Sequence, residues 1–150
     1  MSTSTLLLLL ALTGVCHCFV CPNSWTRYGN SCYAYIGQPL PWVEATSFCR
    51  ASGGRLVEIT SASENTFVQN LINSKGAGKV WFGINDMVEN GRWVLTSNRR
   101  DIPYSNWAPG EPNNLYNNQA CGAIYSNGQW DDEYCSVSRT FTFVCEKQYK

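Results

Sequence analysis

The chain carries eight cysteines in 150 residues, and this count constrains its fold more than any other feature. Cysteines at this density are typical of secreted domains stapled by disulfides, and they argue against a reducing cytosol. The only histidine is His17, close to the N-terminus. If that end is removed, the mature protein has no imidazole for a catalytic triad, a zinc site or a haem ligand.

The charged residues exclude two classes of partner. Eleven basic residues balance eleven acidic ones, and none of them precedes Arg27. Because the lysines and arginines form no cluster, the sequence predicts neither nucleic-acid binding nor attachment to an anionic membrane surface.

A secretory signal is predicted over residues 1–18, followed by one domain over residues 19–150. The apolar run Leu6–Leu12 is too short to span a bilayer and precedes Thr13-Gly14. Cleavage after Cys18 leaves an even number of cysteines, whereas cleavage after Cys16 leaves Cys18 free for an interchain bridge. The even number favours the first site. We therefore expect a secreted, extracellular protein with no membrane span, and a homo-oligomer is left open.

Periodicity and turn signals predict an α+β domain. One helix is expected from Pro41 to Gly53-Gly54, with its buried face formed by Trp42, Ala45, Phe48 and Cys49. A second helix is expected from Ser61, with Glu64 completing a capping box and a buried stripe of Phe67, Val68, Leu71 and Ile72. Short strands are expected at residues 32–36, 80–84, 93–95, 121–125, 128–132 and 141–146. Apart from the strand at 93–95, residues 85–118 are expected to form a long loop.

The six cysteines of the mature chain permit fifteen pairings, and spacing alone does not choose among them. Locality favours two short-range bridges, after which the remaining two cysteines pair over a long loop. The three bridges are then Cys21–Cys32, Cys121–Cys135 and Cys49–Cys145.

Oxygen ligands flank the strand pair expected at residues 121–132. Glu111-Pro112-Asn113 lies late in the loop, Gln119 precedes Cys121 by two residues, and Asp131-Asp132 follows Trp130. Three carboxylates and two amide carbonyls match the hard-oxygen ligands that Ca²⁺ prefers. The Glu111-Pro112 bond is a candidate cis peptide. The alternative interpretation is that these residues are solvated turn formers.

The six tryptophans are typical of a buried core, although a sugar-stacking platform is the alternative. Tyr116 and Tyr134 lie beside the oxygen ligands and are candidate ligand contacts.

Together these segments resemble the long form of the C-type lectin-like domain, from Cys21 to Glu146. The stretch from Cys21 to Tyr33 is similar to the family's extra hairpin, and Trp81–Ile84 is similar to its WIGL strand. Trp107–Asn113 is similar to the W-x-P-G-E-P-N loop, and Trp130-Asp131-Asp132 stands where the WND motif lies. The resemblance implies a C-type lectin-like fold with two helices, short antiparallel sheets, a long Ca²⁺-binding loop and the three disulfides given above.

The resemblance also implies a Ca²⁺ site at which two vicinal hydroxyls of a sugar complete the coordination shell. The implied metal ligands are Glu111, Asn113, Gln119, Asp131 and Asp132, and all except Asp132 are also implied to bind the carbohydrate. Two of them depart from the family, which usually has Glu in place of Gln119 and Asn in place of Asp131. Three carboxylates and two amides remain, so we expect Ca²⁺ binding at a weak affinity of roughly 10⁻⁴ to 10⁻³ M.

Specificity follows from the same residues. The loop sequence E-P-N resembles mannose-type binders, whereas the inverted Gln119/Asp131 pair predicts a relaxed site or one that favours galactose-like diols.

Many members of the family have an auxiliary Ca²⁺ site. Asp86 stands where one of its ligands lies, but Asn90, Asn114 and Ala120 stand where acidic ligands are usual. We expect that second site to be weak or absent.

The resemblance therefore predicts a secreted, Ca²⁺-dependent lectin that recognises microbial glycans in innate immunity. The alternative is a protein- or mineral-binding member of the same fold that uses no sugar. A glycosidase that pairs Glu111 with Asp131 or Asp132 is not expected, because carboxylates that share a metal are ionised and none is left to act as a general acid.

Overall fold

The computed structural model describes residues 19–149. The signal expected at residues 1–18 lies outside the described residues. Within residues 19–149, no helix is long and apolar enough to cross a membrane.

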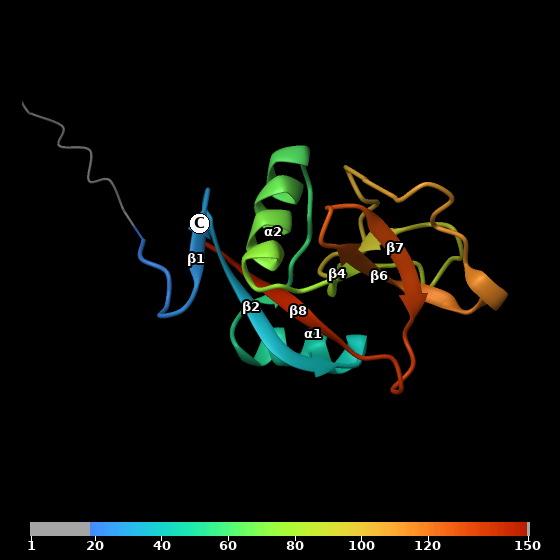
Figure 1. Cartoon of the computed structure of the whole chain (residues 1–150), viewed down its shortest axis with the longest axis horizontal. Coiled ribbons are helices and arrows are strands. Elements are labelled where there is room, and N and C mark those ends of the chain that lie inside the picture. The colour runs from blue at the N-terminus through green and yellow to red at the C-terminus, as the bar shows by residue number, and fades with distance from the viewer. Residues whose placement is uncertain (1–18, 150) are drawn as a thin grey trace, which may run out of the picture.

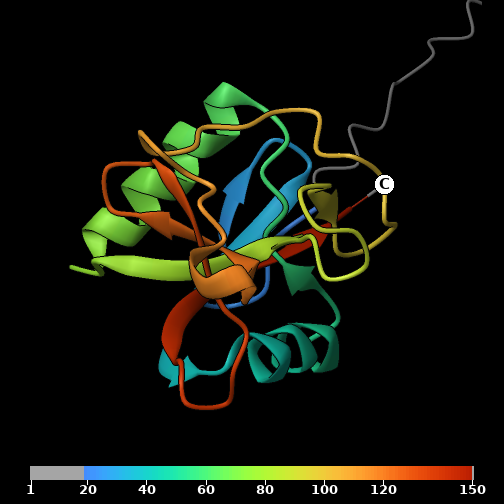
Figure 2. The same ribbon diagram turned by 90° about the vertical axis from the view of Figure 1, so that its right-hand side faces the viewer.

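Two helices cover opposite faces of a twisted sheet (Figures 1 and 2). Helix α1 spans Trp42–Ala51, and α2 spans Ala62–Ser74. The Ser61 Oγ accepts the backbone N–H of Glu64 at 3.2 Å, as the capping box predicts. The Glu64 carboxylate, however, accepts the N–H of Thr60 at 2.8 Å, one residue earlier than in a regular box.

The sheet has the strand order β1-β2-β8-β4-β6-β7, with β3 paired to β8 and β5 paired to β4. Neighbouring strands are antiparallel except for β4 and β8, which are parallel. The bounds are β1 Thr26–Tyr28, β2 Ser31–Leu40, β3 Arg55–Leu56, β4 Lys79–Asn85, β5 Val94–Leu95, β6 Gln119–Tyr125, β7 Trp130–Tyr134 and β8 Phe141–Gln148. Strand β8 is therefore a central strand that lies between β2 and β4.

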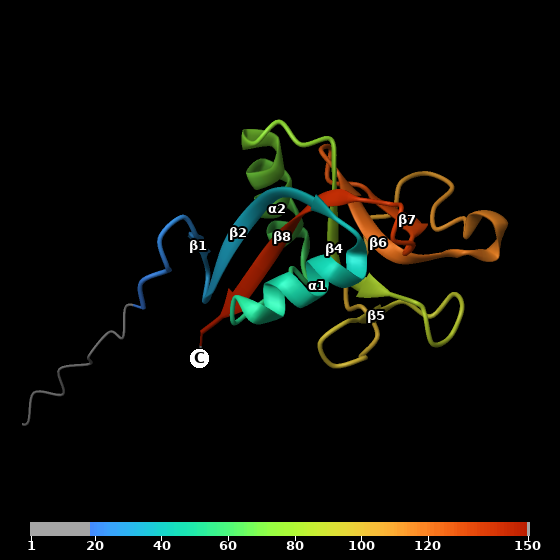
Figure 3. The same ribbon diagram turned by 90° about the horizontal axis from the view of Figure 1, so that it is seen from below.

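The core therefore consists of two clusters, one on each side of the sheet. Val68 and Ile72 of α2 pack with Val144 of β8 in one cluster. Trp42 of α1 packs with Phe143 of β8 in the other. Alternate residues of β8 point to opposite faces, so this strand contributes apolar side chains to both clusters. Figure 3 shows α1 lying along the face that β2 and β8 form.

Three disulfides join these layers, with the pairing expected from locality. The Cys49–Cys145 bridge connects α1 to β8 across 96 residues of sequence. The Cys121–Cys135 bridge fastens β6 to the segment that follows β7. This second bridge fixes the strand pair beside which the oxygen ligands lie.

The expected face of α1 needs one correction. Phe48 is 37% exposed, whereas Thr46 is buried and donates its hydroxyl to the carbonyl of Trp42 at 2.9 Å. The hydrogen bond to the preceding turn removes the cost of burying the Thr46 hydroxyl. A search for apolar residues at helical spacing therefore does not identify this buried position.

The strand expected at residues 128–132 begins later, at Trp130. Gly128 has a φ of 83° and belongs to the turn between β6 and β7. The three-residue strand β1 pairs with the start of β2 as the hairpin expected between Cys21 and Tyr33, whereas the two-residue strand β3 was not expected from the sequence.

Candidate functional site

The late part of the long loop is fastened to strand β7 by backbone hydrogen bonds. The Trp130 N–H donates to the carbonyl of Asn106 at 2.8 Å, and the Ala108 N–H donates to the carbonyl of Trp130 at 2.9 Å. The indoles of Trp107 and Trp130 pack edge to face, with ring centres 5.7 Å apart. These contacts place the following residues, from Glu111 onward, beside the carboxylates of β7.

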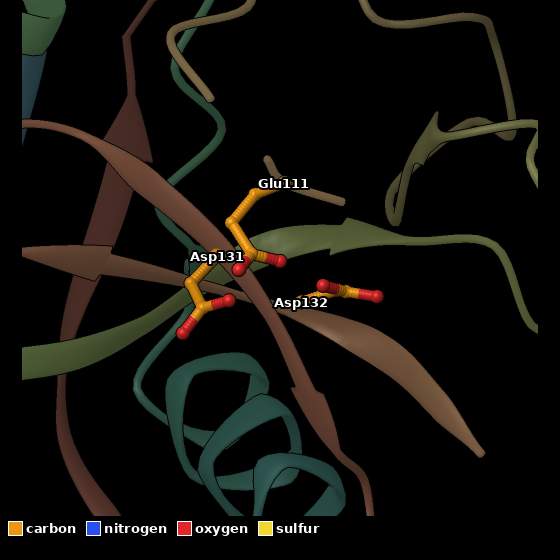
Figure 4. A group of neighbouring side chains, drawn as sticks. All are labelled: Glu111, Asp131 and Asp132. Atoms are coloured by element: carbon orange, nitrogen blue, oxygen red, sulfur yellow. The ribbon is translucent and has the colours of Figure 1, made fainter. Parts of the chain in front are cut away.

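Three carboxylates meet at this junction. Glu111 comes from the loop, and Asp131 and Asp132 come from β7, with one oxygen of each lying within 4.8 Å of the others (Figure 4). Asp131 is 7% exposed and Asp132 is fully buried. Carboxylates repel one another at such distances unless a cation or a proton is shared between them, so this cluster has the character of a cation site.

Asp132 also organises the loop. Its Oδ1 accepts the N–H of Asn113 at 3.0 Å, and its Oδ2 accepts the N–H of Asn114 at 2.6 Å. The Asn113 side-chain amide donates to Glu111 Oε1 at 2.9 Å, and the Glu111-Pro112 peptide is cis. Four of the five expected ligands, Glu111, Asn113, Asp131 and Asp132, are thereby brought together.

Gln119, the fifth expected ligand, begins strand β6 at the end of the loop. Its Oε1 accepts the N–H of Leu115 at 2.7 Å, and its own N–H donates to Asn114 Oδ1 at 3.1 Å. Gln119 therefore holds the loop end in place through both its backbone and its side chain. A carbonyl oxygen has a second lone pair, so the role of Gln119 as a metal ligand stays a prediction.

Asp131 has partners that the sequence analysis missed. Its Oδ2 accepts from Lys79 Nζ at 2.5 Å and from the Tyr125 hydroxyl at 2.7 Å. The same Nζ donates to Glu133 Oε1 at 2.6 Å. The one available signal was the D-x-E spacing of Asp131 and Glu133, which puts both carboxylates on one face of a strand. The sequence does not reveal which cation faces them.

These contacts set the charge state of Lys79. Burial alone would lower the pKa of the Lys79 ammonium, but the hydrogen bonds to Asp131 and Glu133 outweigh this and raise it. Lys79 is therefore a fixed positive charge beside the carboxylate cluster.

The pKa of Glu111 moves in the direction expected of crowded carboxyl groups. Burial, together with the neighbouring Asp132 and Asp131 carboxylates, raises the pKa of Glu111 to about 7. The cluster thus carries more negative charge than the folded protein readily accommodates. Three carboxylates and an amide carbonyl are the donors that suit a hard divalent cation, so these residues fit Ca²⁺.

A second group of polar residues surrounds Asp86, beside a cavity of about 620 Å³. Asp86 Oδ2 accepts the N–H of Gly91 at 2.8 Å, and burial raises the pKa of the Asp86 carboxyl. The Asn114 amide donates to Asn90 Oδ1 at 2.9 Å. Asp86 is the one carboxylate among the residues that line this cavity.

The aromatic residues divide between core and surface. Trp42, Trp81, Trp93 and Trp130 are buried, in agreement with the core interpretation. Tyr116 lies in the 3₁₀ turn Leu115–Asn117 and is 84% exposed, next to the carboxylate cluster in sequence. Of the two tyrosines singled out, Tyr116 is the more accessible to a ligand in solution, since Tyr134 is half-buried.

Comparison with known proteins identifies the family. The family model of the lectin C-type domain matches residues 38–147. The chain belongs to the C-type lectin domain family. This confirms the fold that the resemblance implied, and because the family is not enzymatic, the protein is not a glycosidase.

Individual relatives agree with this assignment. The chain is 33% identical to a perlucin-like protein of Mytilus galloprovincialis, over 91% of this chain and 90% of that protein. It is 31% identical to asialoglycoprotein receptor 1 of Rattus norvegicus, over 85% of this chain but only 45% of the receptor. The chain superposes on the solved carbohydrate-recognition domain of cow CD23, which was crystallised in the presence of a GlcNAc2Man3 oligosaccharide. The TM-score is 0.80 at 28% sequence identity, and the match covers 89% of this chain and 99% of the CD23 domain.

Proposed function

We propose that this C-type lectin domain binds glycans through a Ca²⁺ ion held by Glu111, Asn113, Gln119, Asp131 and Asp132. The observation that carries the proposal is the meeting of the Glu111, Asp131 and Asp132 carboxylates within 4.8 Å. The similarity to asialoglycoprotein receptor 1 and to the carbohydrate-recognition domain of cow CD23 supports a sugar as the ligand. A bound Ca²⁺ supplies coordination positions for two vicinal sugar hydroxyls.

The protein groups orient the sugar by hydrogen bonding. The Asn113 side-chain amide is a donor and the Glu111 carboxylate is an acceptor, and the amide donates to the carboxylate at 2.9 Å. A sugar hydroxyl inserted between them accepts from Asn113 and donates to Glu111, so neither group loses a partner. Since the loop is fixed on Asp132 before the sugar arrives, binding orders few additional residues.

A second donor–acceptor pair consists of Gln119 and Asp131. One lone pair of the Gln119 carbonyl accepts the Leu115 N–H, and the side-chain NH₂ is the donor of this pair. Asp131 contributes an acceptor, because a carboxylate has no N–H. Mannose-type diols suit the Glu111–Asn113 pair. We infer that the reversed Gln119/Asp131 pair relaxes this preference and admits galactose-type diols.

We propose that the protein is exported by the segment at residues 1–18 and acts outside the cell in innate recognition of microbial glycans. Three disulfides support an oxidising compartment. A single shallow sugar site binds weakly, so useful avidity requires several copies. We infer that a homo-oligomer forms through domain contacts, or through Cys18 where cleavage follows Cys16.

The function is tested by retention of the domain on mannose- and galactose-bearing resins in Ca²⁺, followed by elution with EDTA. We expect retention on both resins and release by the chelator. Retention on mannose alone contradicts the relaxed specificity. Ca²⁺ binding without retention on any glycan contradicts the lectin function and favours the protein- or mineral-binding alternative.

Matched variants separate the site from general charge effects. Asp132→Asn removes a buried charge of the cluster, and we expect it to abolish retention. Glu44→Gln removes an exposed charge on α1 and should leave retention unchanged. Melting curves in EDTA show whether the Asp132 variant remains folded.

A further inference from the structure

Lys79 reaches across strand β6 to the carboxylates of β7. It pairs in register with Tyr125 of β6, and its Nζ lies 4.3 Å from the centre of the Tyr125 ring. The same Nζ contacts Asp131 Oδ2 at 2.5 Å and Glu133 Oε1 at 2.6 Å, and the side chain is 16% exposed. The ammonium is thus enclosed by an aromatic ring and two carboxylates, and its position is fixed.

The two oxygens of Asp131 have different surroundings. Oδ2 accepts from both Lys79 and the Tyr125 hydroxyl. Within residues 19–149, both of these donors bind the same oxygen of the Asp131 carboxylate, Oδ2. Figure 4 shows one oxygen of Asp131 directed toward Glu111 and Asp132 and the other turned away. Because the donors hold Oδ2, Oδ1 is the oxygen that remains for the carboxylate cluster.

The charges of Lys79 and its neighbouring side chains balance one another. Arg139 binds the Glu133 carboxylate at 2.7 Å and 2.9 Å, so Lys79 and Arg139 together balance Asp131 and Glu133. Glu111 and Asp132 are then left with two negative charges, which a divalent cation neutralises. Lys79 therefore lets an aspartate stand at position 131 without adding a third uncompensated charge.

We propose that Lys79 is a positioning residue for the calcium site: it holds Asp131 with one oxygen facing Glu111 and Asp132, and it determines that an aspartate is the functional residue at position 131. The inference rests on the proposed calcium site. It goes beyond that proposal because it assigns a role to a residue that touches neither the metal nor the sugar.

The proposal makes an unusual prediction for Asp131→Asn, which preserves the shape of the side chain. With Lys79 present, the ammonium attracts the carbonyl of the new amide, and the NH₂ is turned toward the cation. An NH₂ group cannot coordinate Ca²⁺. When Lys79 is replaced as well, the carbonyl is free to turn toward the cation, while the Tyr125 hydroxyl can accept from the NH₂.

The test is a double-mutant cycle of Lys79→Met and Asp131→Asn, with the Ca²⁺ affinity of each purified domain measured by calorimetry. We expect Asp131→Asn alone to weaken Ca²⁺ binding by about tenfold or more, because loss of a ligand should cost at least as much as loss of a residue that only orients one. The double variant should bind Ca²⁺ several-fold more tightly than Asp131→Asn alone. If Lys79 only stabilised the fold, the double variant would be the weakest of the four proteins.

A second readout does not involve the metal. In EDTA, Lys79→Met leaves Asp131 without its ammonium, so the melting temperature should fall, and adding Asp131→Asn should restore part of the loss. Lys75→Met removes an exposed lysine after α2 and should change neither readout. If Lys79→Met does not fold, Lys79→Gln takes its place in the cycle with the same expected order of affinities.

The outcomes are distinguishable. If the wild-type domain binds no Ca²⁺, the proposed function fails and the inference fails with it. If the wild type binds Ca²⁺ but Asp131→Asn has the same effect with and without Lys79, only the inference is overturned. Wild-type affinity in Asp131→Asn alone also overturns it.

Discussion

Lowering the pH from 8 to 6 should release Ca²⁺ from this domain because of Glu111. Burial and the adjacent Asp132 and Asp131 carboxylates raise the pKa of Glu111 to about 7 in the metal-free protein. Ca²⁺ binds the ionised carboxylate and must displace the proton. The apparent affinity then falls by a factor of 1 + 10^(7 − pH), which is about 1.1 at pH 8 and about 11 at pH 6. We therefore predict an approximately tenfold loss over two pH units.

Stability of the metal-free domain should change in the opposite direction. The pKa of Glu111 is higher in the folded chain than its ordinary unfolded value of 4.5, so the folded state binds this proton more tightly. This group destabilises the fold above pH 7, and the destabilisation disappears as the pH falls through 7 toward about 4.5. The Glu111→Gln variant lacks the titrating group, so the difference between wild type and variant isolates its contribution.

Calorimetry in two buffers of different ionisation enthalpy gives the number of protons released per Ca²⁺ bound. A pKa of about 7 predicts about 0.9 proton at pH 6, about 0.5 at pH 7 and about 0.1 at pH 8. A ¹³C titration of the Glu111 carboxyl in EDTA should have its midpoint near pH 7. An ordinary midpoint near 4.5, with no proton release at pH 6, would refute the reasoning.

Three further predictions concern stability. Replacing Cys49 and Cys145 by Ala opens a loop of 96 residues and should lower the free energy of unfolding by about 4 to 5 kcal/mol. Opening the 14-residue Cys121–Cys135 loop in the same way should cost about 3 kcal/mol. Both values are measured by urea unfolding, and the reverse order would contradict the prediction. Asn65→Ala removes the acceptor of Trp130 Nε1 at 2.7 Å and the donor to the Gly128 carbonyl at 2.9 Å. It should lower the free energy of unfolding by about 2 to 4 kcal/mol in the same assay. The control Asn70→Ala, at an exposed position of α2, should change it little. Ca²⁺ at ten times its Kd should stabilise the wild type by about 1.4 kcal/mol, measured as a rise in melting temperature that is absent in Asp132→Asn.

Much of the fold follows from local signals in the sequence. The second helix begins where Ser61 and Glu64 indicate, because an N-cap depends on residues three positions apart. The disulfide pairing was also accessible, since two of the bridges join cysteines 11 and 14 residues apart and the third follows by elimination. The burial of Thr46 was not predicted, and Phe48 is more exposed than predicted although its ring contacts Phe143 of β8, because the periodicity of the helix does not contain the position of its neighbours.

The candidate site was predictable only where its residues lie in recognisable segments. Glu111, Asn113 and Asp132 belong to motifs, and the structure brings them together. Lys79 was not predictable, because it is 52 residues before Asp131 and meets it only through the pairing of β4 with β6 and of β6 with β7. The raised pKa of Glu111 was inaccessible for the same reason, since it depends on carboxylates that meet only in the folded chain.

The central claim is that one Ca²⁺ ion, held by the Glu111, Asp131 and Asp132 cluster, is required for sugar binding. The most direct measurement is a calorimetric titration of the metal-free domain with Ca²⁺, followed by titration of methyl α-mannoside into the calcium-loaded and the EDTA-treated protein. The account predicts a site with a Kd of roughly 10⁻⁴ to 10⁻³ M for Ca²⁺ and sugar binding only in the loaded protein. Sugar binding that is equally strong in EDTA would contradict it.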